Sequence, residues 1–235
     1  MKLLLATLPL GLLSLFPPAL PRPQLAQSGH PTSAPAPDST IVRLLYGAES
    51  ADLTELMGHV LHVEKHRLLL HDRRLAGRHL RLTLQEYRGG VPGPEKPLDS
   101  DASLTQLDSA GRLAMTIYAR PASETKVENT FMLPRASMPR TFAAVPGQAS
   151  NYSLRFDIHP LRRSSNQAGA AVGNPATEFK LPLSGPATVL AVYTLPYKQG
   201  DMYYYCNLAQ SHVPVTEWYS RFRVPHFVVY RARLE

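Results

Sequence analysis

The feature that most constrains the fold of this chain is an alternation of apolar and polar residues over several short stretches. Residues 152–158 alternate most cleanly, and residues 78–88 and 112–119 repeat the pattern. Successive side chains of a β-strand point to opposite faces, so a period of two predicts strands with one buried face and one solvated face. Because residues 78–88 and 112–119 present matching apolar faces, we predict that they are neighbours in one sheet.

Residues 186–235 contain the most complete folding unit in the sequence. The unbroken apolar run at residues 189–195 is too short for a typical helix and predicts a strand buried on both faces. The tyrosine-rich residues 202–208 predict the second arm of a hairpin with this strand. Cys206 lies in that second arm, where the apolar setting is typical of an inert buried thiol. A final strand is predicted at residues 227–234.

Two short helices are predicted. The first would begin with Ser50 as its N-cap and stop at Gly58, and the second would begin with Thr216 and stop before Pro225. Each carries apolar residues at the three- and four-residue spacings of one helix face. These residues are Leu53, Leu56 and Met57 in the first helix, and Val215, Trp218, Tyr219 and Phe222 in the second.

Composition and strand count together set the fold class. With 235 residues, 44% hydrophobic and 18% charged, the chain can bury one sizeable core or two small ones. Short strands at roughly regular spacing predict a mainly β fold with an antiparallel, sandwich-like body and two short helices. The sequence at Pro121 marks a candidate boundary between β-rich subdomains at residues 39–121 and 122–235. A single continuous sandwich is the alternative.

The first residues have the organisation of a secretory signal peptide. Lys2 precedes a leucine-rich apolar run at residues 3–16, which is too short to span a bilayer comfortably. Cleavage is predicted after Ala26, which gives a signal peptide of residues 1–26. Cleavage after Ala19 and an uncleaved anchor are the alternatives.

A proline-rich leader follows the signal peptide. Seven prolines lie between residues 17 and 37 among Ala, Gln, Ser and Thr, a composition that cannot build a core. We therefore predict that residues 27–38 are a disordered tether and that the protein is secreted or periplasmic, with no transmembrane segment in the mature chain. Cys206 is the only cysteine, so the fold must be stable without an internal disulfide.

The charge balance is modestly basic. The formal charge of +7 falls to +5 in the mature chain, because residues 1–26 contain Lys2 and Arg22 and no acidic residue. Cations within residues 59–88 predict a basic patch that attracts an anionic envelope polymer or an acidic protein partner, while export argues against nucleic acid. A solvated charged face is the alternative. The patch comprises Lys65, Arg67, Arg73, Arg74, Arg78 and Arg81.

Histidines near the start of this segment are candidate metal ligands. If residues 62–66 form a strand, His62, Glu64 and His66 share one face; if they form a helix, His59 lines up with the two histidines instead. Imidazole and carboxylate groups are ligands that Zn²⁺ accepts. Neighbouring cations would repel a metal ion and no fourth ligand is identifiable, so we expect no cofactor and keep zinc as the alternative.

The sequence offers little that could support nucleophilic catalysis. It contains no G-x-S-x-G nucleophile elbow, no H-E-x-x-H pair, no glycine-rich phosphate loop and no paired-cysteine metal motif. We therefore predict no catalytic residue. A hydrolase is the alternative if scattered polar residues meet in three dimensions. The candidates for such a site are Ser153, Asp157 and His159, or His212 and Glu217.

Several turn and core segments resemble those of secreted, uncharacterised β-rich proteins from Gram-negative bacteria. They are QEYRGG at residues 85–90, LPY at residues 195–197, and residues 202–209 and 218–230, within a match that covers most of the chain beyond Ser39. The resemblance implies a β-rich envelope protein and brings no catalytic residue with it. Together these observations predict an exported, non-enzymatic binding or structural module of the cell envelope. A metal-binding protein and a hydrolase are the alternatives.

Overall fold

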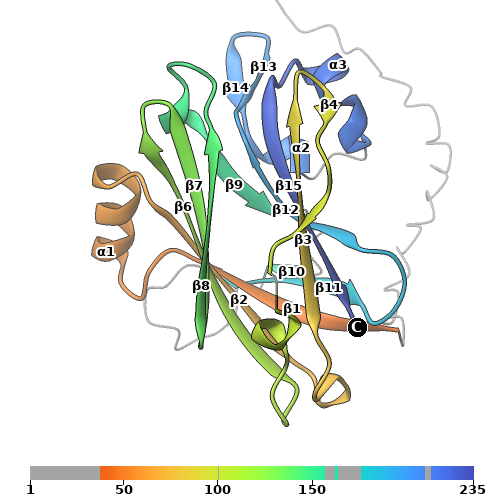
Figure 1. Ribbon diagram of the computed structural model, residues 1–235. Coiled ribbons are helices and arrows are strands. Elements are labelled where there is room, and N and C mark those ends of the chain that lie inside the picture. Colours follow the sequence, from red (N-terminus) through yellow and green to blue (C-terminus); the bar gives the residue numbers. More distant parts are fainter. Residues whose placement is uncertain (1–37, 100, 157–161, 164–175, 210–212) are drawn as a thin grey trace, which may run out of the picture. The chain divides into compact units, whose positions relative to one another are not determined.

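Two antiparallel sheets face each other in the part of the chain that the computed structural model describes (Figure 1). The described residues belong to one compact unit. The predicted signal peptide, and all of the predicted leader except Asp38, lie outside them. No helix in these ranges is long and apolar enough to cross a bilayer. The described ranges are residues 38–99, 101–156, 162–163, 176–209 and 213–235.

The larger sheet has seven strands and draws on both halves of the chain. Strand β6 continues through Pro121, the predicted boundary, and pairs with strands on either side of it in sequence. In spatial order the strands are β10 (Arg162–Arg163), β11 (Thr177–Pro182), β1 (Ser39–Tyr46), β2 (Glu64–His71), β6 (Arg112–Ser123), β7 (Lys126–Leu133) and β8 (Ala136–Ala143).

The second sheet has six strands and places the C-terminal strand near its centre. The predicted final strand is confirmed, because β15 pairs with β3 along nine residues and with β12 on its other side. In spatial order the strands are β4 (Val91–Pro92), β3 (Leu80–Arg88), β15 (His226–Leu234), β12 (Thr188–Thr194) and β9 (Ser153–Phe156), with β5 (Lys96–Pro97) paired to β3.

Short elements connect and cover the sheets. Strands β13 (Tyr197–Gln199) and β14 (Met202–Tyr204) form a separate two-stranded hairpin. The α-helical pieces are α1 (Ala51–Glu55), α2 (Cys206–Ala209) and α3 (Trp218–Phe222). The π- and 3-10 turns are η1 (Leu56–Val60), η2 (Arg73–Leu75), η3 (Ala102–Thr105), η4 (Ala149–Asn151) and η5 (Val215–Glu217).

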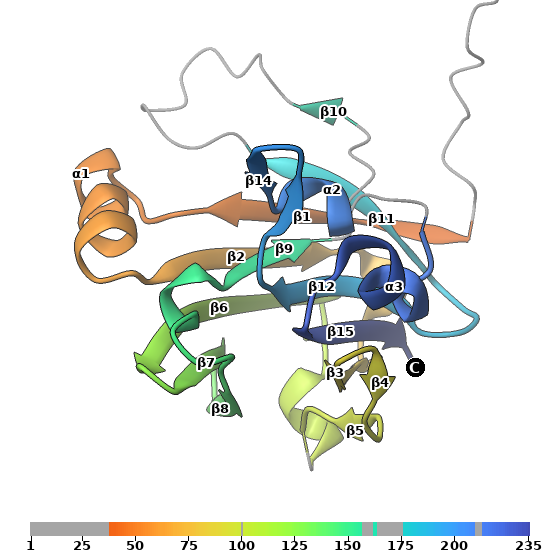
Figure 2. The same ribbon diagram turned by 90° about the horizontal axis from the view of Figure 1, so that it is seen from above.

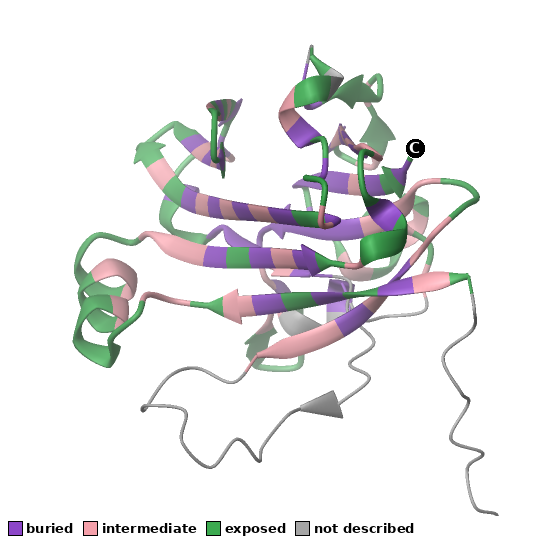
Figure 3. Ribbon diagram, turned by 90° about the horizontal axis from the view of Figure 1, so that it is seen from below, coloured by how far each residue is buried: buried purple, intermediate pink, exposed green. Residues whose placement is uncertain are grey.

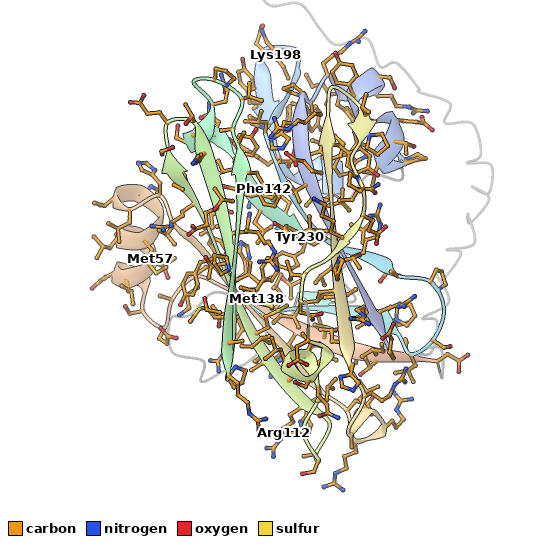
Figure 4. All side chains as sticks on the ribbon, in the orientation of Figure 1. Met57, Arg112, Met138, Phe142, Lys198 and Tyr230 are labelled. Carbon is orange, nitrogen blue, oxygen red and sulfur yellow. The ribbon has the colours of Figure 1, made fainter. Side chains whose placement is uncertain are left out.

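The core fills the space between the sheets with the apolar faces of alternating strands. Figure 4 labels Met138 and Phe142 of β8 and Tyr230 of β15, which are buried in this space. The ring centroids of Phe131 and Tyr230 lie 5.0 Å apart across it. The mainly β, antiparallel, sandwich-like fold with two short helices is confirmed.

The predicted pairing of residues 78–88 with residues 112–119 is wrong. Both segments are strands with the expected inward faces, but β3 belongs to the six-stranded sheet and β6 to the seven-stranded sheet. Alternation specifies which face of a strand is buried, and two strands that face each other across a core carry the same pattern as two neighbours.

A helical layer explains why the centre of the six-stranded sheet is buried on both faces. The predicted strand at residues 189–195 is confirmed as β12, which lies between β15 and β9. On the outer face, Phe227 of β15 stacks on Tyr87 at 4.7 Å and meets Trp218 of α3 at 5.1 Å. Figure 2 shows α3 and the β13–β14 hairpin on this side of the sheet.

The predicted hairpin between residues 189–195 and 202–208 is wrong. Both edges of β12 are occupied by β15 and β9, so the tyrosine-rich segment forms the short hairpin of β13 and β14 instead. The chain leaves extended geometry after Tyr204, and Cys206 begins the helical turn α2 rather than continuing a strand. The second predicted helix also starts earlier than Thr216, because η5 begins after Pro214.

The first predicted helix forms but buries none of its residues. Ser50 caps α1 as predicted, with its hydroxyl accepting a hydrogen bond from the backbone N–H of Leu53 at 3.2 Å. The helix passes Gly58, its predicted end, and continues as the π-turn η1 to Val60. Figure 3 shows that this helix is exposed or half-buried throughout.

Candidate functional site

The structure brings together two of the three predicted metal ligands, Glu64 and His66. Strand β2 begins at Glu64, so the strand alternative holds and the two side chains share a face. His66 Nε2 lies 3.8 Å from a Glu64 carboxylate oxygen. His62 precedes the strand, is exposed, and has a left-handed backbone with φ of 52°. Within the described ranges, no three His, Cys, Asp or Glu side chains converge as a ligand group.

Glu64 links the two sheets at the edge strand β9. One carboxylate oxygen accepts a hydrogen bond from the backbone N–H of Leu154 at 2.6 Å, and the other accepts one from the Ser153 hydroxyl. Burial opposes ionisation of Glu64, but the nearby His66 imidazole and Arg155 guanidinium outweigh it and hold the Glu64 pKa below its ordinary value. The carboxylate therefore satisfies a backbone N–H of β9, which is the last strand of this sheet among the described residues.

The six cations of the predicted basic patch lie in three places. Lys65 and Arg67 project from the outer face of β2, Arg73 and Arg74 lie in the η2 turn, and Arg78 and Arg81 lie just before and within β3 of the other sheet.

Four of these six cations have partners within the fold. Arg74 lies 2.6 Å from Asp72, and its hydrogen bonds hold the pKa of Asp72 well below the ordinary value. Arg67 and Arg73 make no ion pair with any described residue. The other partnerships are Lys65 with Glu49, Arg81 with Asp99 and Glu235, and Arg78 with the backbone carbonyls of Leu183 and Leu234.

A hollow of about 770 Å³ lies at the end of the seven-stranded sheet that is opposite α1. Thr116 of β6 pairs with Met132 of β7, so residues 112–114 extend beyond the end of β7 and leave an open edge. The β7–β8 turn and the segment that follows η3 flank this edge. The cavity volume falls within the range of small-ligand and side-chain pockets.

The floor of the hollow is apolar and its rim is cationic. Ile41 of β1 and Leu69 of β2 contribute outward-facing apolar side chains, and Leu104 of η3 adds another. Arg43, Arg112 and Arg135 are all exposed, whereas Asp108 is the single acidic lining residue, so the lining carries two net positive charges with His71 neutral.

The rim arginines differ in how strongly they are held. Arg112 lies 3.2 Å from Asp108, and the Arg112 backbone N–H also donates to that carboxylate, which lowers the Asp108 pKa. Arg43 lies 3.5 Å from Glu178. Arg135, in the β7–β8 turn, has no ion pair or hydrogen bond with the described residues. It is the rim cation most available to an incoming anion.

Arg43, Arg112 and Arg135 were not among the site residues predicted from the sequence. Each lies far from the others in sequence, and only the pairing of β1, β2 and β6 brings the first two onto one face. The available signal for Arg43 and Arg112 was their position opposite the buried residues of alternating segments, whereas Arg135 lies in a turn. That signal marks a solvated face without showing which strands share it.

A second polar cluster lies between the sheets around His226. Its Nδ1 is 2.6 Å from the Tyr152 hydroxyl, and its Nε2 is 3.0 Å from Glu86. Burial and the Arg88 guanidinium lower the His226 pKa to about 4, against the opposing effect of Glu86. The imidazole is therefore neutral at pH 7, with Nε2–H donating to Glu86 and Nδ1 accepting from Tyr152.

The residues of the hydrolase alternative do not assemble within the described ranges. Ser153 donates its hydroxyl proton to Glu64, and Glu217 pairs with Arg221 at 2.7 Å on the other side of the fold. The remaining candidates, Asp157, His159 and His212, lie outside the described residues.

Comparison with protein-family models, curated proteins and solved structures found no match for this chain.

Proposed function

We propose that this protein is an exported, non-enzymatic binding module of the cell envelope, and that it binds an acidic protein segment in the hollow of its seven-stranded sheet. The observation that carries the proposal is the combination of an apolar floor with three rim arginines, Arg43, Arg112 and Arg135. Arginine is enriched in protein interfaces because it pairs bidentately with carboxylates. The apolar run at residues 3–16 supports export.

The apolar floor favours a protein segment over a purely anionic polymer. A polymer bearing only charged and hydroxyl groups would pair with the rim but would offer no apolar group to Ile41, Leu69 and Leu104 of the floor. A segment that alternates carboxylates with aliphatic side chains satisfies both parts of the hollow.

Binding can be tested with a fluorescent peptide of alternating glutamate and leucine residues, titrated with the protein at low and high salt. We expect saturable binding that weakens with salt and that Arg135→Glu weakens about tenfold, the effect of losing roughly 1.4 kcal/mol from an interfacial charge pair. Lys198→Glu makes the same charge change at the opposite end of the body and should leave the affinity unchanged (Figure 4).

The result that contradicts the proposal is peptide binding that responds equally to both substitutions, or no binding at low salt. Dextran sulfate serves as the polymer probe. If it binds with the same Arg135 dependence and displaces the peptide at equal charge concentration, the apolar floor contributes nothing and the partner is a polymer.

A further inference from the structure

The helix formed by α1 and η1 carries an apolar stripe that is not buried by any of the residues that the structure describes. Leu53, Leu56 and Val60 follow the three- and four-residue spacings of one helix face, and Leu61 extends it. Leu56 is 46% exposed and Val60 is 65% exposed. A stripe of this kind normally packs on a core, and here none of the residues of α1 or η1 is buried.

The same helix is acidic. Residues 49–61 contain three carboxylates and no lysine or arginine. Glu49 pairs with Lys65 at 3.0 Å, whereas Asp52 and Glu55 form no ion pair with described residues. The helix therefore combines aliphatic side chains with free carboxylates, which is the chemistry that the hollow is proposed to bind.

The helix and the hollow lie at opposite ends of the same two strands. The helix joins the end of β1 to the start of β2, whereas the hollow uses Ile41 near the start of β1 and His71 at the end of β2. Five strand residues separate Tyr46 from Ile41, a distance of about 17 Å along β1. A copy cannot fill its own hollow with this helix, because the two are fixed at opposite ends of one hairpin.

We propose that the α1–η1 helix of one copy docks in the hollow of the next copy, head to tail. This inference rests on the proposed function, since it names the acidic partner of that hollow. Asp52 and Glu55 pair with the rim arginines, and the leucines and Val60 cover the floor, as in other helix-in-groove complexes. The contact joins two different surfaces, so each added copy presents a free helix and a free hollow, and the assembly extends.

Sedimentation velocity of the protein expressed from its full-length coding sequence tests this proposal. The sedimentation coefficient of the wild type should rise with concentration and fall with salt. Val60→Lys, on the helix, and Arg135→Glu, on the hollow, should each remove that dependence. Val91→Lys, at a residue that is 69% exposed on β4, and Lys198→Glu are the matched controls and should sediment as the wild type does.

Mixing the two interface variants distinguishes this geometry from any symmetric dimer. The Val60→Lys copy retains its hollow and the Arg135→Glu copy retains its helix, so an equimolar mixture should form 1:1 dimers and no larger species. In a symmetric dimer both copies use the same surface. The mixed pair would then carry one substitution on each side of its interface, and the 1:1 dimer should not form.

Two outcomes overturn the inference. One is a wild type that remains monomeric at every concentration, and the other is a mixture that does not form the 1:1 dimer. If the Glu-Leu peptide still binds the Val60→Lys variant in either case, that variant is folded, its hollow works, and the proposed function stands without self-association. Loss of peptide binding as well would refute both.

Discussion

Protonation of His226 should make this protein markedly less stable in mild acid. The imidazole is 1% exposed and lies between Tyr152 and Glu86 at the inner face of β15. A second proton on Nδ1 would remove the acceptor that the Tyr152 hydroxyl uses, and would place a buried charge near Arg88. The folded protein therefore stabilises the neutral imidazole and disfavours its protonation.

The size of the effect follows from the two pKa values. The His226 pKa is about 4 in the fold and 6.5 as its ordinary value. Below pH 6.5 the unfolded chain takes up a proton that the folded chain does not, so the free energy of unfolding decreases as pH falls and levels off below about pH 4. At about 1.4 kcal/mol per pKa unit, the full loss is on the order of 3 kcal/mol, and most of it occurs between pH 7.5 and pH 4.5.

Urea unfolding of the wild type and of His226→Gln at these two pH values isolates this contribution. Glutamine can donate to Glu86 and accept from Tyr152 but does not titrate, so the wild type should lose roughly 2 to 3 kcal/mol more than the variant on acidification. An equal loss in both proteins would refute the reasoning. So would an NMR titration of the native protein in which the His226 imidazole protonates near pH 6.5, a test that does not depend on the variant folding.

Three further substitutions probe the fold by urea unfolding at pH 7.5. Glu64→Ala leaves the Leu154 N–H at the β9 edge unpaired and should lower the free energy of unfolding by about 2 kcal/mol, the usual contribution of a hydrogen bond to a charged group. A loss below about 0.5 kcal/mol would contradict a stabilising role for this hydrogen bond. Gly111→Ala should cost more than about 2 kcal/mol, because φ is +70° and the new Cβ would lie 1.9 Å from the Asp72 carbonyl oxygen; wild-type stability would refute that contact. Tyr230→Phe should be neutral or stabilising by up to about 1 kcal/mol, since the buried hydroxyl has no hydrogen-bond partner among the described residues, and a clear loss would show a partner.

The sequence predicted the strands better than it predicted their neighbours. Alternation identified β3, β6 and β9 and their inward faces, because the period of two is a local property of the backbone. Whether two such strands pair or face each other depends on contacts between distant segments. The assignment of β3 and β6 to one sheet failed for that reason, and so did the hairpin partner of β12.

The candidate site could not be predicted from the sequence either, because its residues are distant from one another along the chain. The predicted patch grouped cations by their closeness in sequence, but the η2 turn directs the chain from one sheet to the other, so Arg67 and Arg81 project from different sheets. The hollow instead contains Arg43, Arg112 and Arg135. About seventy residues separate the first two in sequence, and about twenty separate the second from the third. The register of β1, β2 and β6 brings Arg43 and Arg112 onto one face.

The α1–η1 helix shows how an amphipathic pattern can be correct while its partner is missing. Ser50 and the apolar spacing predicted the helix, and both are present, but the stripe faces solvent. Helices of this length are marginal alone and normally gain their stability from packing an apolar face. In the single copy the helix is held by the Ser50 cap and by the hydrogen bonds of Thr54 with the backbone at Ser50 and Ala48. Docking in the hollow of a second copy would supply the packing that its own core does not. The stability of this helix would then depend on assembly.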